Sequence, residues 1–399
     1  MKNNSLFQNA LILGLITAVG PFAVDMYLPA LPAIGKALGQ DENGAMLTLT
    51  AFFASFGVFQ LIFGTISDMY GRRGPLLAGL LLFSATSAGC ALADSSDSLI
   101  VLRFLQGIGG AAGIIIARAI VRDLYHGIQE VKMMSLLMLV FSVSPLLAPL
   151  AGSYIIEFFD WRALFWVLCG LGVAGIVLML LCLSETLPPE KRITAGFSSM
   201  KAAFAALIRD RPYVGMTLIG AFGITAFFIF LGNSSFVMMD YYGLTSREFS
   251  FVFSANAVAF FAAAQCNGFL SKRFGIHTII LPAAVGFGLS MALMAIFALA
   301  GMTSLVLMMG FMFAGFACLG IILPTISVMA LANHGGIAGT AASVANTVQL
   351  VIGAAAIGVS GLFADGTPVP MALGMAGCAV LTLVCSIWTF ALHQVEEPE

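Results

Sequence analysis

The sequence has 399 residues, of which 60% are hydrophobic and 9% are charged, and its formal net charge is −2. Because soluble domains carry about 25% charged residues, this composition excludes an ordinary soluble enzyme. The small net charge alone indicates no partner.

Long apolar segments recur along the whole chain, each close to the roughly 20 residues that cross a bilayer core about 30 Å thick. Segments of a transmembrane β-barrel are about half as long and alternate in polarity, so these segments predict helices. We therefore expect an all-α membrane protein with 12 transmembrane helices, at residues 9–31, 45–67, 74–93, 98–118, 134–156, 162–183, 212–236, 248–270, 278–300, 303–325, 337–363 and 370–392.

The distribution of lysine and arginine predicts the orientation of these helices, because cytoplasmic loops carry an excess of both residues. With the N-terminus inside, Lys36, Arg162 and Arg247 would lie outside, and Arg103 lies within an apolar segment. The other 13 of the 17 basic residues would lie inside. We expect both termini in the cytoplasm, and a first helix that is retained rather than cleaved as a signal peptide.

A polar stretch near the middle divides the sequence into an N-terminal six-helix half (1–184), a cytoplasmic linker (185–211) and a C-terminal six-helix half (212–399). The two halves have weak sequence similarity, since GTISDMYGRR at 64–73 aligns with GFLSKRFGIH at 268–277. Repeated six-helix halves are typical of transporters with a substrate site near the bilayer midplane.

Two charged residues, Asp25 and Arg103, lie inside apolar segments. An intramembrane charge costs at least ~2.5–3.5 kcal/mol and persists mainly where it has a function. At 1.5 Å of rise per residue, both lie within roughly 10 Å of the predicted outer boundary. Their matching depth favours one shared site, although a static buried pair that joins two helices is the structural alternative.

Arg103 belongs to the run LIVLRFLQGIGGA at 99–111. Helical spacing places Arg103 and Gln106 on one face, and the glycines of the run allow close helix packing. The same glycines mimic a dinucleotide-binding loop, but no strand precedes them, which argues against that reading.

The run GTISDMYGRRGPL at 64–76 follows the second apolar segment. Its glycines permit a tight turn, Asp68 and Arg72 can pair at the cytoplasmic rim, and Asp123 could complete an ion network. An ordinary turn with topology-setting arginines is the alternative. The predicted cytoplasmic gate comprises Gly64, Asp68, Gly71, Arg72, Arg73 and Asp123.

These runs resemble those of a known family. The run at 64–76 resembles the major facilitator superfamily signature G-x-L-A/S-D-R-x-G-R-R/K-x-x-L, with Met69 at a usually basic position, and 99–111 resembles the superfamily's helix-4 motif. The superfamily's Bcr/CflA group of drug exporters is matched by FAVDMYLPALP at 22–32, MSLLMLV at 134–140 and ETLPPEKR at 185–192. The resemblance is dense in the first half and rests on topology in the second.

The fifth apolar segment contains SVSPLLAPLAG at 142–152, where antiporters of this family carry a glycine-rich motif. Pro145, Pro149 and Gly152 suit a bend and close packing. A proline-kinked packing helix without a role in transport is the alternative.

The resemblance implies a central cavity lined by the first and fourth helices, and a gate that holds the outward-open state. The proton affinity of a buried carboxylate depends on its desolvation and on nearby cations. A substrate that changes either one changes proton binding, and by reciprocity a proton weakens substrate binding. We expect Asp25 and Arg103 to couple protons to substrate, which binds at Asp25, Tyr27, Arg103, Gln106, Asn233, Asn256, Asn346 and Gln349. For the second-half residues, pairing between helices is an equally good reading.

The leading hypothesis is a drug/proton antiporter that exports small amphipathic antibiotics such as bicyclomycin or chloramphenicol. The alternatives are a proton-coupled transporter of a sugar or nucleoside and a non-transporting membrane sensor. ATP-binding, zinc-protease and serine-hydrolase motifs are missing from the sequence, so we expect no enzyme, catalytic residue, cofactor or metal. The expected partners are drug, proton and lipid, without nucleic acid, for a monomer in the bacterial inner membrane.

Overall fold

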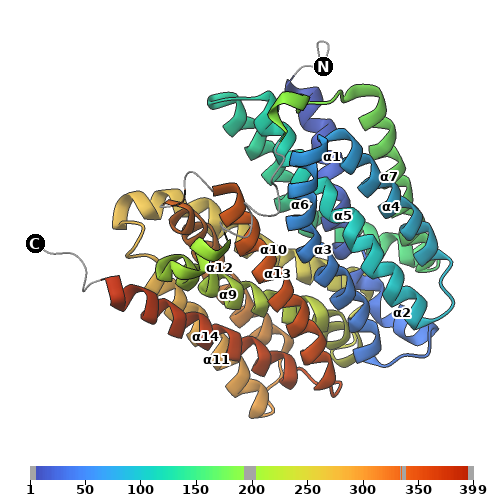
Figure 1. Ribbon diagram of the computed structural model, residues 1–399. Helices are drawn as coiled ribbons and strands as arrows, with labels where there is room; N and C mark the ends of the chain where they lie inside the picture. Colours follow the sequence, from blue (N-terminus) through green and yellow to red (C-terminus); the bar gives the residue numbers. More distant parts are fainter. Residues whose placement is uncertain (1–5, 193–203, 333, 335–337, 394–399) are drawn as a thin grey trace, which may run out of the picture. The chain divides into compact units, whose positions relative to one another are not determined.

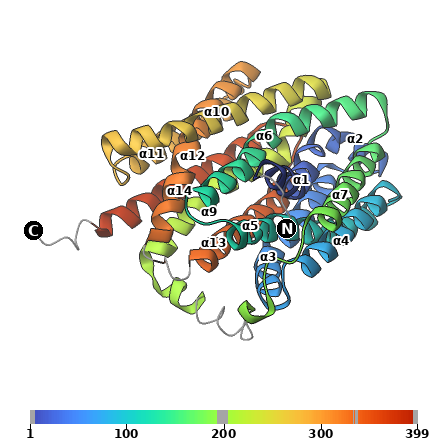
Figure 2. The ribbon, with the colours of Figure 1, turned by 90° about the horizontal axis from the view of Figure 1, so that it is seen from above.

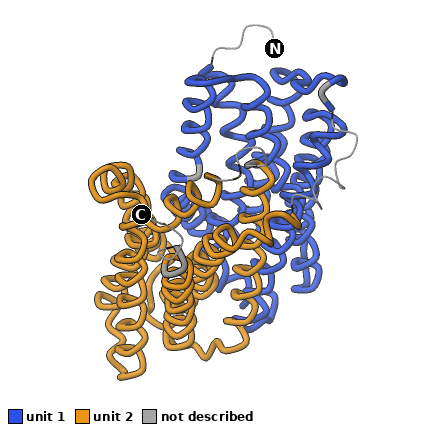
Figure 3. Tube along the Cα trace, turned by 60° about the vertical axis from the view of Figure 1, so that its left-hand side comes forward, with its two compact units in different colours: residues 1–199 blue, residues 200–399 orange. Residues whose placement is uncertain are grey.

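The computed structural model describes residues 6–192, 204–332, 334 and 338–393 (Figure 1). The chain forms two compact units, residues 1–199 and 200–399 (Figure 3). The division falls inside the segment 185–211, whose assignment as a cytoplasmic linker stays a prediction.

The predicted all-α architecture agrees with the structure. The described residues contain 12 helices that are long and apolar enough to cross a membrane. These spans are Leu6–Ala37, Glu42–Tyr70, Arg73–Ala91, Ser96–Leu124, Ile128–Phe158, Arg162–Cys182, Arg211–Tyr241, Ser246–Phe274, Ile280–Leu299, Leu305–Ala332, Gly339–Leu362 and Val369–Phe390.

The first unit is a bundle of long helices. Its elements are α1 (Leu6–Asp25), η1 (Leu28–Ala30), α2 (Leu31–Ala37), α3 (Glu42–Tyr70), α4 (Arg73–Ala91), α5 (Ser96–Leu124), α6 (Ile128–Phe158), α7 (Arg162–Cys182) and η2 (Pro189–Lys191). Helix α5 packs against α1, α3 and α4, while α7 packs against α1 and α4. A buried apolar cluster that includes Leu13, Leu80 and Ile116 joins α1, α4 and α5.

The second unit repeats this packing. Its elements are α9 (Arg211–Ser235), the π-helical turn η3 (Phe236–Tyr241), α10 (Ser246–Phe274), α11 (Ile280–Leu299), α12 (Leu305–Ala332), α13 (Ala338–Leu362) and α14 (Val369–His393), as Figures 1 and 2 show. Helix α12 packs against α9, α10 and α11, and α14 packs against α9 and α11. Each pair has a counterpart in the first unit, so the weak sequence repeat corresponds to a structural one.

The first helix ends at Asp25, whereas the sequence predicted one segment over 9–31. Two prolines explain the difference. Pro29 and Pro32 each lack a backbone N–H, so the carbonyls of Asp25 and Leu28, four residues earlier, have no α-helical donor. The chain therefore passes through the short helix η1 before α2 begins at Leu31. This break places Asp25 at a helix end rather than within a helix.

Glycines let α5 lie very close to its neighbours. A Cβ at Gly109 would come within 2.6 Å of the backbone nitrogen of Phe83 on α4. One at Gly113 would lie 2.6 Å from the backbone oxygen of Ile16 on α1. Real Cβ atoms do not approach so closely, so these glycines fix α5 against α1 and α4, as expected for small residues between membrane helices.

Candidate functional site

Asp25 is buried at the break after α1. Its Oδ2 accepts a 3.0 Å hydrogen bond from the Oγ of Ser144 on α6. Ser144 is fully buried. Helix α6 approaches this break a second time, because a Cβ at Gly152 would collide with the backbone oxygen of Met26. The predicted antiporter helix, which contains Pro145 and Pro149, thus contacts both the carboxyl group and the backbone of the break.

Arg103 lies on α5 with no exposed surface. Its guanidinium carbon lies 4.5 Å from the ring centroid of Tyr27 and 4.4 Å from that of Phe52. Such cation–π contacts contribute about 2 kcal/mol or more where water is excluded. Two aromatic rings therefore offset part of the cost of burying this charge.

Arg103 also binds the segment that carries Asp25. Its Nη1 donates to the carbonyl of Ala23 at 3.1 Å and to the Oε1 of Gln106 at 2.6 Å. The Ala23 carbonyl is available because the N–H of Tyr27 bonds to the carbonyl of Val24, one residue closer than its α-helical partner. The break in the first helix thus creates the acceptor for Arg103.

Polar side chains from neighbouring helices fix the groups around Arg103. The Nε2 of Gln106 donates to the Oγ of Ser87 on α4 at 2.7 Å. The hydroxyls of Tyr27 and Thr48 lie 2.7 Å apart. Because Thr48 gives its single proton to the carbonyl of Ala45 at 2.6 Å, the Tyr27 hydroxyl must be the donor of that pair.

Asp25 and Arg103 do not pair with each other. Within the described part of the chain, neither residue takes part in an ion pair, and the buried Nε and Nη2 of Arg103 have no hydrogen-bond partner. A buried charge without a counter-charge costs several kcal/mol. The site therefore holds two unused donors and a nearby carboxyl group.

Arg72 joins the predicted gate residues at the turn between α3 and α4. Its guanidinium forms ion pairs with Asp68 at 2.5 Å and with Asp123 at 2.8 Å. It also donates to the Oγ of Ser67 at 2.9 Å. Burial lowers the pKa of Arg72, but the hydrogen bonds to Asp123 and Asp68 outweigh it and hold the pKa above its usual value. The ion network is thus present, while its role as a gate stays a prediction.

Glu185 closes this network from the segment after α7. Its carboxylate accepts the backbone N–H groups of Arg72 at 2.8 Å and Arg73 at 3.1 Å, where α4 begins. Partial burial raises the pKa of Glu185, but backbone N–H groups, including those of Leu187 and Arg72, outweigh it and lower the pKa below its usual value. A carboxylate at this position satisfies N–H groups that a helix start leaves free and interacts favourably with the helix dipole.

Of the two glycines predicted in the gate, Gly64 and Gly71, only Gly71 has a conformation and surroundings that require glycine. Gly71 has a φ of +95°, and a Cβ there would lie 2.6 Å from the carboxylate of Glu185. A Cβ at Gly64 would meet Ile115 at an ordinary 3.6 Å. Close helix packing therefore does not explain why position 64 is a glycine.

Two of the predicted second-half residues, Asn233 and Asn256, make separate hydrogen bonds within the second unit. Asn233 on α9 donates to the carbonyl of Ile229 at 2.8 Å and to Ser360 on α13 at 3.0 Å. Asn256 on α10 donates to the carbonyl of Val252 at 3.1 Å, while its buried Oδ1 has no partner among the described residues. Asn233 acts as a link between helices, and Asn256 keeps a free acceptor.

Asn346 and Gln349 lie half-buried on α13. The Nε2 of Gln349 lies against α9, since a Cβ at Gly220 would be 2.7 Å from it. Gln349 therefore fills space between two helices of its own unit, and a role for either residue in substrate binding stays a prediction.

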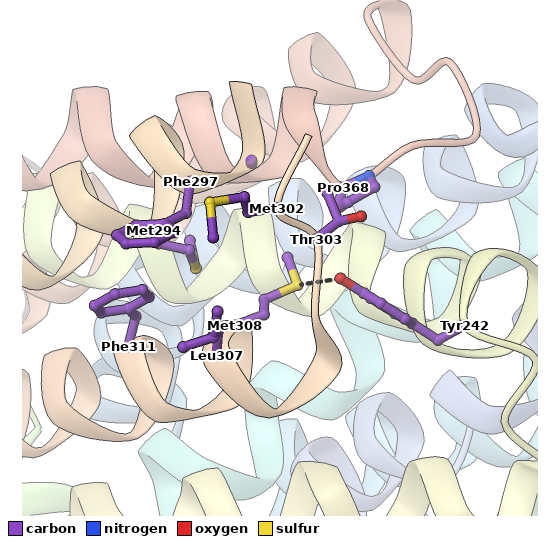
Figure 4. A pocket seen from close by; sticks show the side chains of 10 residues that line it. Tyr242, Met294, Phe297, Met302, Thr303, Leu307, Met308, Phe311 and Pro368 are labelled. Atoms are coloured by element: carbon purple, nitrogen blue, oxygen red, sulfur yellow. Dashed lines mark hydrogen bonds between the residues drawn. The ribbon is translucent and has the colours of Figure 1, made fainter. Parts of the chain in front are cut away.

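A pocket in the second unit is too small for a drug. Tyr242, Met294, Phe297, Met302, Thr303, Met308, Phe311 and Pro368 surround it (Figure 4). Its volume of about 10 Å³ is at the lower limit for one water molecule. The Tyr242 hydroxyl donates to the sulfur of Met308 at 3.4 Å across it, and burial, followed by the neighbouring Tyr241, raises the pKa of Tyr242 to about 12.

Some site residues were not predicted from the sequence. Ser144 lies in the run SVSPLLAPLAG, and Glu185 lies in ETLPPEKR, so both stood in segments that matched the family. Thr186 extends the ion network around Arg72, because its Oγ1 donates to Asp123 at 3.0 Å. Phe52 had no signal, since it is one of 34 phenylalanines.

The two repeated helical units and the charges buried within the first unit define a membrane transporter. The model of the Major Facilitator Superfamily matches residues 13–358. The Bacillus subtilis protein YdgK, an uncharacterized MFS-type transporter, is 33% identical over 378 residues, which are 93% of this chain and 92% of that one. A bicyclomycin resistance protein homolog from Haemophilus influenzae is 30% identical over 392 residues, 96% of each chain.

A solved structure agrees at the level of the fold. The crystal structure of a D-xylose-proton symporter has a TM-score of 0.76 with 15% identity and covers 97% of this chain and 98% of that one. This chain belongs to the major facilitator superfamily, and its resemblance to the drug-resistance group is supported by the relative from Haemophilus. It is a multi-pass transporter of the bacterial inner membrane that carries a small-molecule substrate, rather than an enzyme.

Proposed function

We propose that this transporter exports small amphipathic drugs in exchange for protons, with Asp25 as the proton carrier. The observation that carries the proposal is the arrangement at the end of α1. Arg103 binds the carbonyl of Ala23, two residues before Asp25, and keeps two buried donors without a partner. A substrate acceptor that binds those donors would act on the segment that holds the carboxyl group.

Similarity to the Haemophilus bicyclomycin resistance protein homolog supports a drug as the substrate. The aromatic rings of Tyr27 and Phe52 beside Arg103 suit a ligand with both polar and apolar parts. Gln106 orients Arg103 from the adjacent turn of α5. In the second half, we propose Asn233, Asn256, Asn346 and Gln349 as polar substrate contacts.

We further propose that both termini are cytoplasmic, that the protein acts as a monomer, and that the ion network around Arg72 is a cytoplasmic gate. The gate assignment is supported because residues from three separate segments bind Arg72. Asp68 on α3, Asp123 on α5 and Glu185 after α7 all bind Arg72. A movement that separates α3, α5 and the segment after α7 would have to break these bonds together.

Transport by inverted membrane vesicles tests the function. We expect a pH gradient to drive uptake of bicyclomycin or chloramphenicol by the wild type, and a protonophore to abolish it. Asp25→Asn should reduce this uptake to background, because the amide cannot carry the proton. The matched control Asp97→Asn, which changes an exposed carboxylate in the first turn of α5, should transport normally.

Gradient-driven uptake of either drug by Asp25→Asn at the wild-type rate would contradict the proposal. Uptake of a sugar or nucleoside instead of drugs would assign the chain to metabolite transport.

A further inference from the structure

The second unit contains a larger pocket at the start of α9 that is distinct from the residues proposed above. Its volume is about 250 Å³, close to the lower end of the ~300–1,000 Å³ that small-molecule pockets occupy. Polar lining comes from Asp210, Tyr213, His277 and His334, and apolar lining from Pro212, Met216, Ile276, Val328, Met329, Ala330 and Ala332.

Asp210 supplies the negative charge of this pocket. It stands at the N-cap of α9, yet its side chain makes no cap hydrogen bond. Pro212 in the first turn of α9 has no N–H to offer, which removes one of the usual partners of a capping side chain. The carboxylate instead lies 2.7 Å, through Oδ2, from the Nε2 of His334, which follows α12.

The other polar lining residues, Tyr213, His277 and His334, have aromatic rings. The rings of Tyr213 and His334 meet edge to face with centroids 5.4 Å apart. The Tyr213 hydroxyl donates to the carbonyl of Ala341 on α13 at 2.7 Å, which fixes the ring. His277 lines the pocket from the turn before α11.

The charge and the aromatic rings of the lining residues determine which class of ligand the pocket can bind. Asp210 is the one acidic side chain among the described residues that line the pocket. An ammonium group binds favourably to a carboxylate and to aromatic faces, whereas an anion would be repelled by Asp210. Exposed Arg209 and Arg211 flank Asp210 in the sequence but do not line the pocket.

We propose that this pocket binds a small arylalkyl amine, with its ammonium group on Asp210 and its apolar part against Met216, Ile276 and Val328. The carboxylate can hold the amine through Oδ1 while Oδ2 remains on His334. This binding site would be separate from the proton and drug site at Asp25, and it does not depend on that assignment.

Binding of tritiated phenethylamine to the full chain in lipid nanodiscs tests the proposal. We expect saturable binding by the wild type and by Asp25→Asn. Asp210→Asn should weaken binding about ten-fold or more, the effect of losing a hydrogen bond between charged groups. Ala330→Phe should also weaken it by filling the pocket, while Asp365→Asn, which changes an exposed loop carboxylate outside the lining set, should bind as the wild type does.

Competition between labelled phenethylamine and unlabelled compounds uses only the wild type, so its result does not depend on the folding of a variant. Unlabelled phenethylamine should displace the probe, whereas phenylethanol and phenylacetate, which have the same ring but no positive charge, should not. Equal displacement by phenylethanol, an absence of saturable binding, or unchanged binding by Asp210→Asn would overturn the proposal. Loss of binding in Asp25→Asn alone would place the amine at the transport site and overturn it as well.

Discussion

Arg103 is held inside the first unit by contacts that only an arginine makes together. Its guanidinium carbon lies over the rings of both Tyr27 and Phe52, and its Nη1 donates to both Ala23 and Gln106. Lysine has a compact ammonium group that cannot reproduce this planar fork. The shape of the side chain therefore matters beside its charge.

We expect Arg103→Lys to insert and fold but to lose most substrate-induced proton release, because a lysine ammonium group cannot contact both rings while it binds the Ala23 carbonyl. Proton release on drug addition, measured in weakly buffered detergent, checks this. Wild-type release by Arg103→Lys would show that charge alone is sufficient.

Ser144 is the hydrogen-bond donor to Asp25, and its removal tests whether α6 takes part in coupling. We expect Ser144→Ala to slow proton-driven uptake about ten-fold, since hydrogen bonds to charged groups contribute about 1.5–3 kcal/mol. Ser144→Thr, which keeps the hydroxyl, should retain more activity. Ser142→Ala is the control, because the Ser142 hydroxyl bonds to its own helix at Met138. Equal rates in the Ala variants at 142 and 144 would refute a role for Ser144.

At the scale of elements, α6 and the break after α1 fit together through backbone contact. A side chain at position 152 must displace the Met26 carbonyl. We expect Gly152→Ala to destabilise the protein by about 1–3 kcal/mol, the usual cost of overpacking, and to reduce transport. Gly170→Ala on α7, where the added Cβ meets nothing within 4 Å, should do neither. Thermal unfolding in detergent compares the two variants, and equal melting temperatures would argue against the close contact.

The start of α4 depends on Glu185, and this dependence has a defined pH range. The pKa of Glu185 is lowered in the folded protein, so ionised Glu185 stabilises the fold above its unfolded pKa of about 4.3. This contribution is lost as pH falls through the folded pKa. We expect Glu185→Gln to lower the melting temperature near neutral pH and to remove part of the acid sensitivity below about pH 4.3. Glu190→Gln, an exposed neighbour, serves as the control, and identical profiles for both variants would contradict this role.

The elements were largely predictable, because length and hydrophobicity alone specify membrane helices. The helix break at Asp25 was not predicted, although Pro29 and Pro32 signalled it, since hydropathy does not distinguish η1 from a continuing helix. The ion pair between Arg72 and Asp68 was predicted because one sequence motif contains both charges. The Glu185 contact depends on backbone N–H groups, which have no sequence signal.

The individual contacts of the buried charges could not be predicted for a physical reason. Matching depth suggested that Asp25 and Arg103 share a site, but depth does not give the rotation of a helix about its axis. The structure turns Asp25 toward Ser144 and Arg103 toward Tyr27 and Phe52. Aromatic partners of this kind cannot be selected from a sequence rich in phenylalanine.

For the whole molecule, the distribution of the basic residues predicts the orientation in the membrane. In a background free of the seven native cysteines, we expect a membrane-impermeant maleimide to label Asp94→Cys in intact cells. Asp94 has a side chain that is 95% exposed, between α4 and α5. Glu190→Cys should react only after the cells are opened. The reverse pattern would place the termini outside.

In the proposed mechanism, one carboxyl group, that of Asp25, exchanges its proton for drug. The most direct test adds chloramphenicol or bicyclomycin to purified protein in weakly buffered detergent and records released protons. We predict release from the wild type and from Asp97→Asn, and none from Asp25→Asn. Release from Asp25→Asn equal to that of the wild type would contradict the role of Asp25 as the proton carrier.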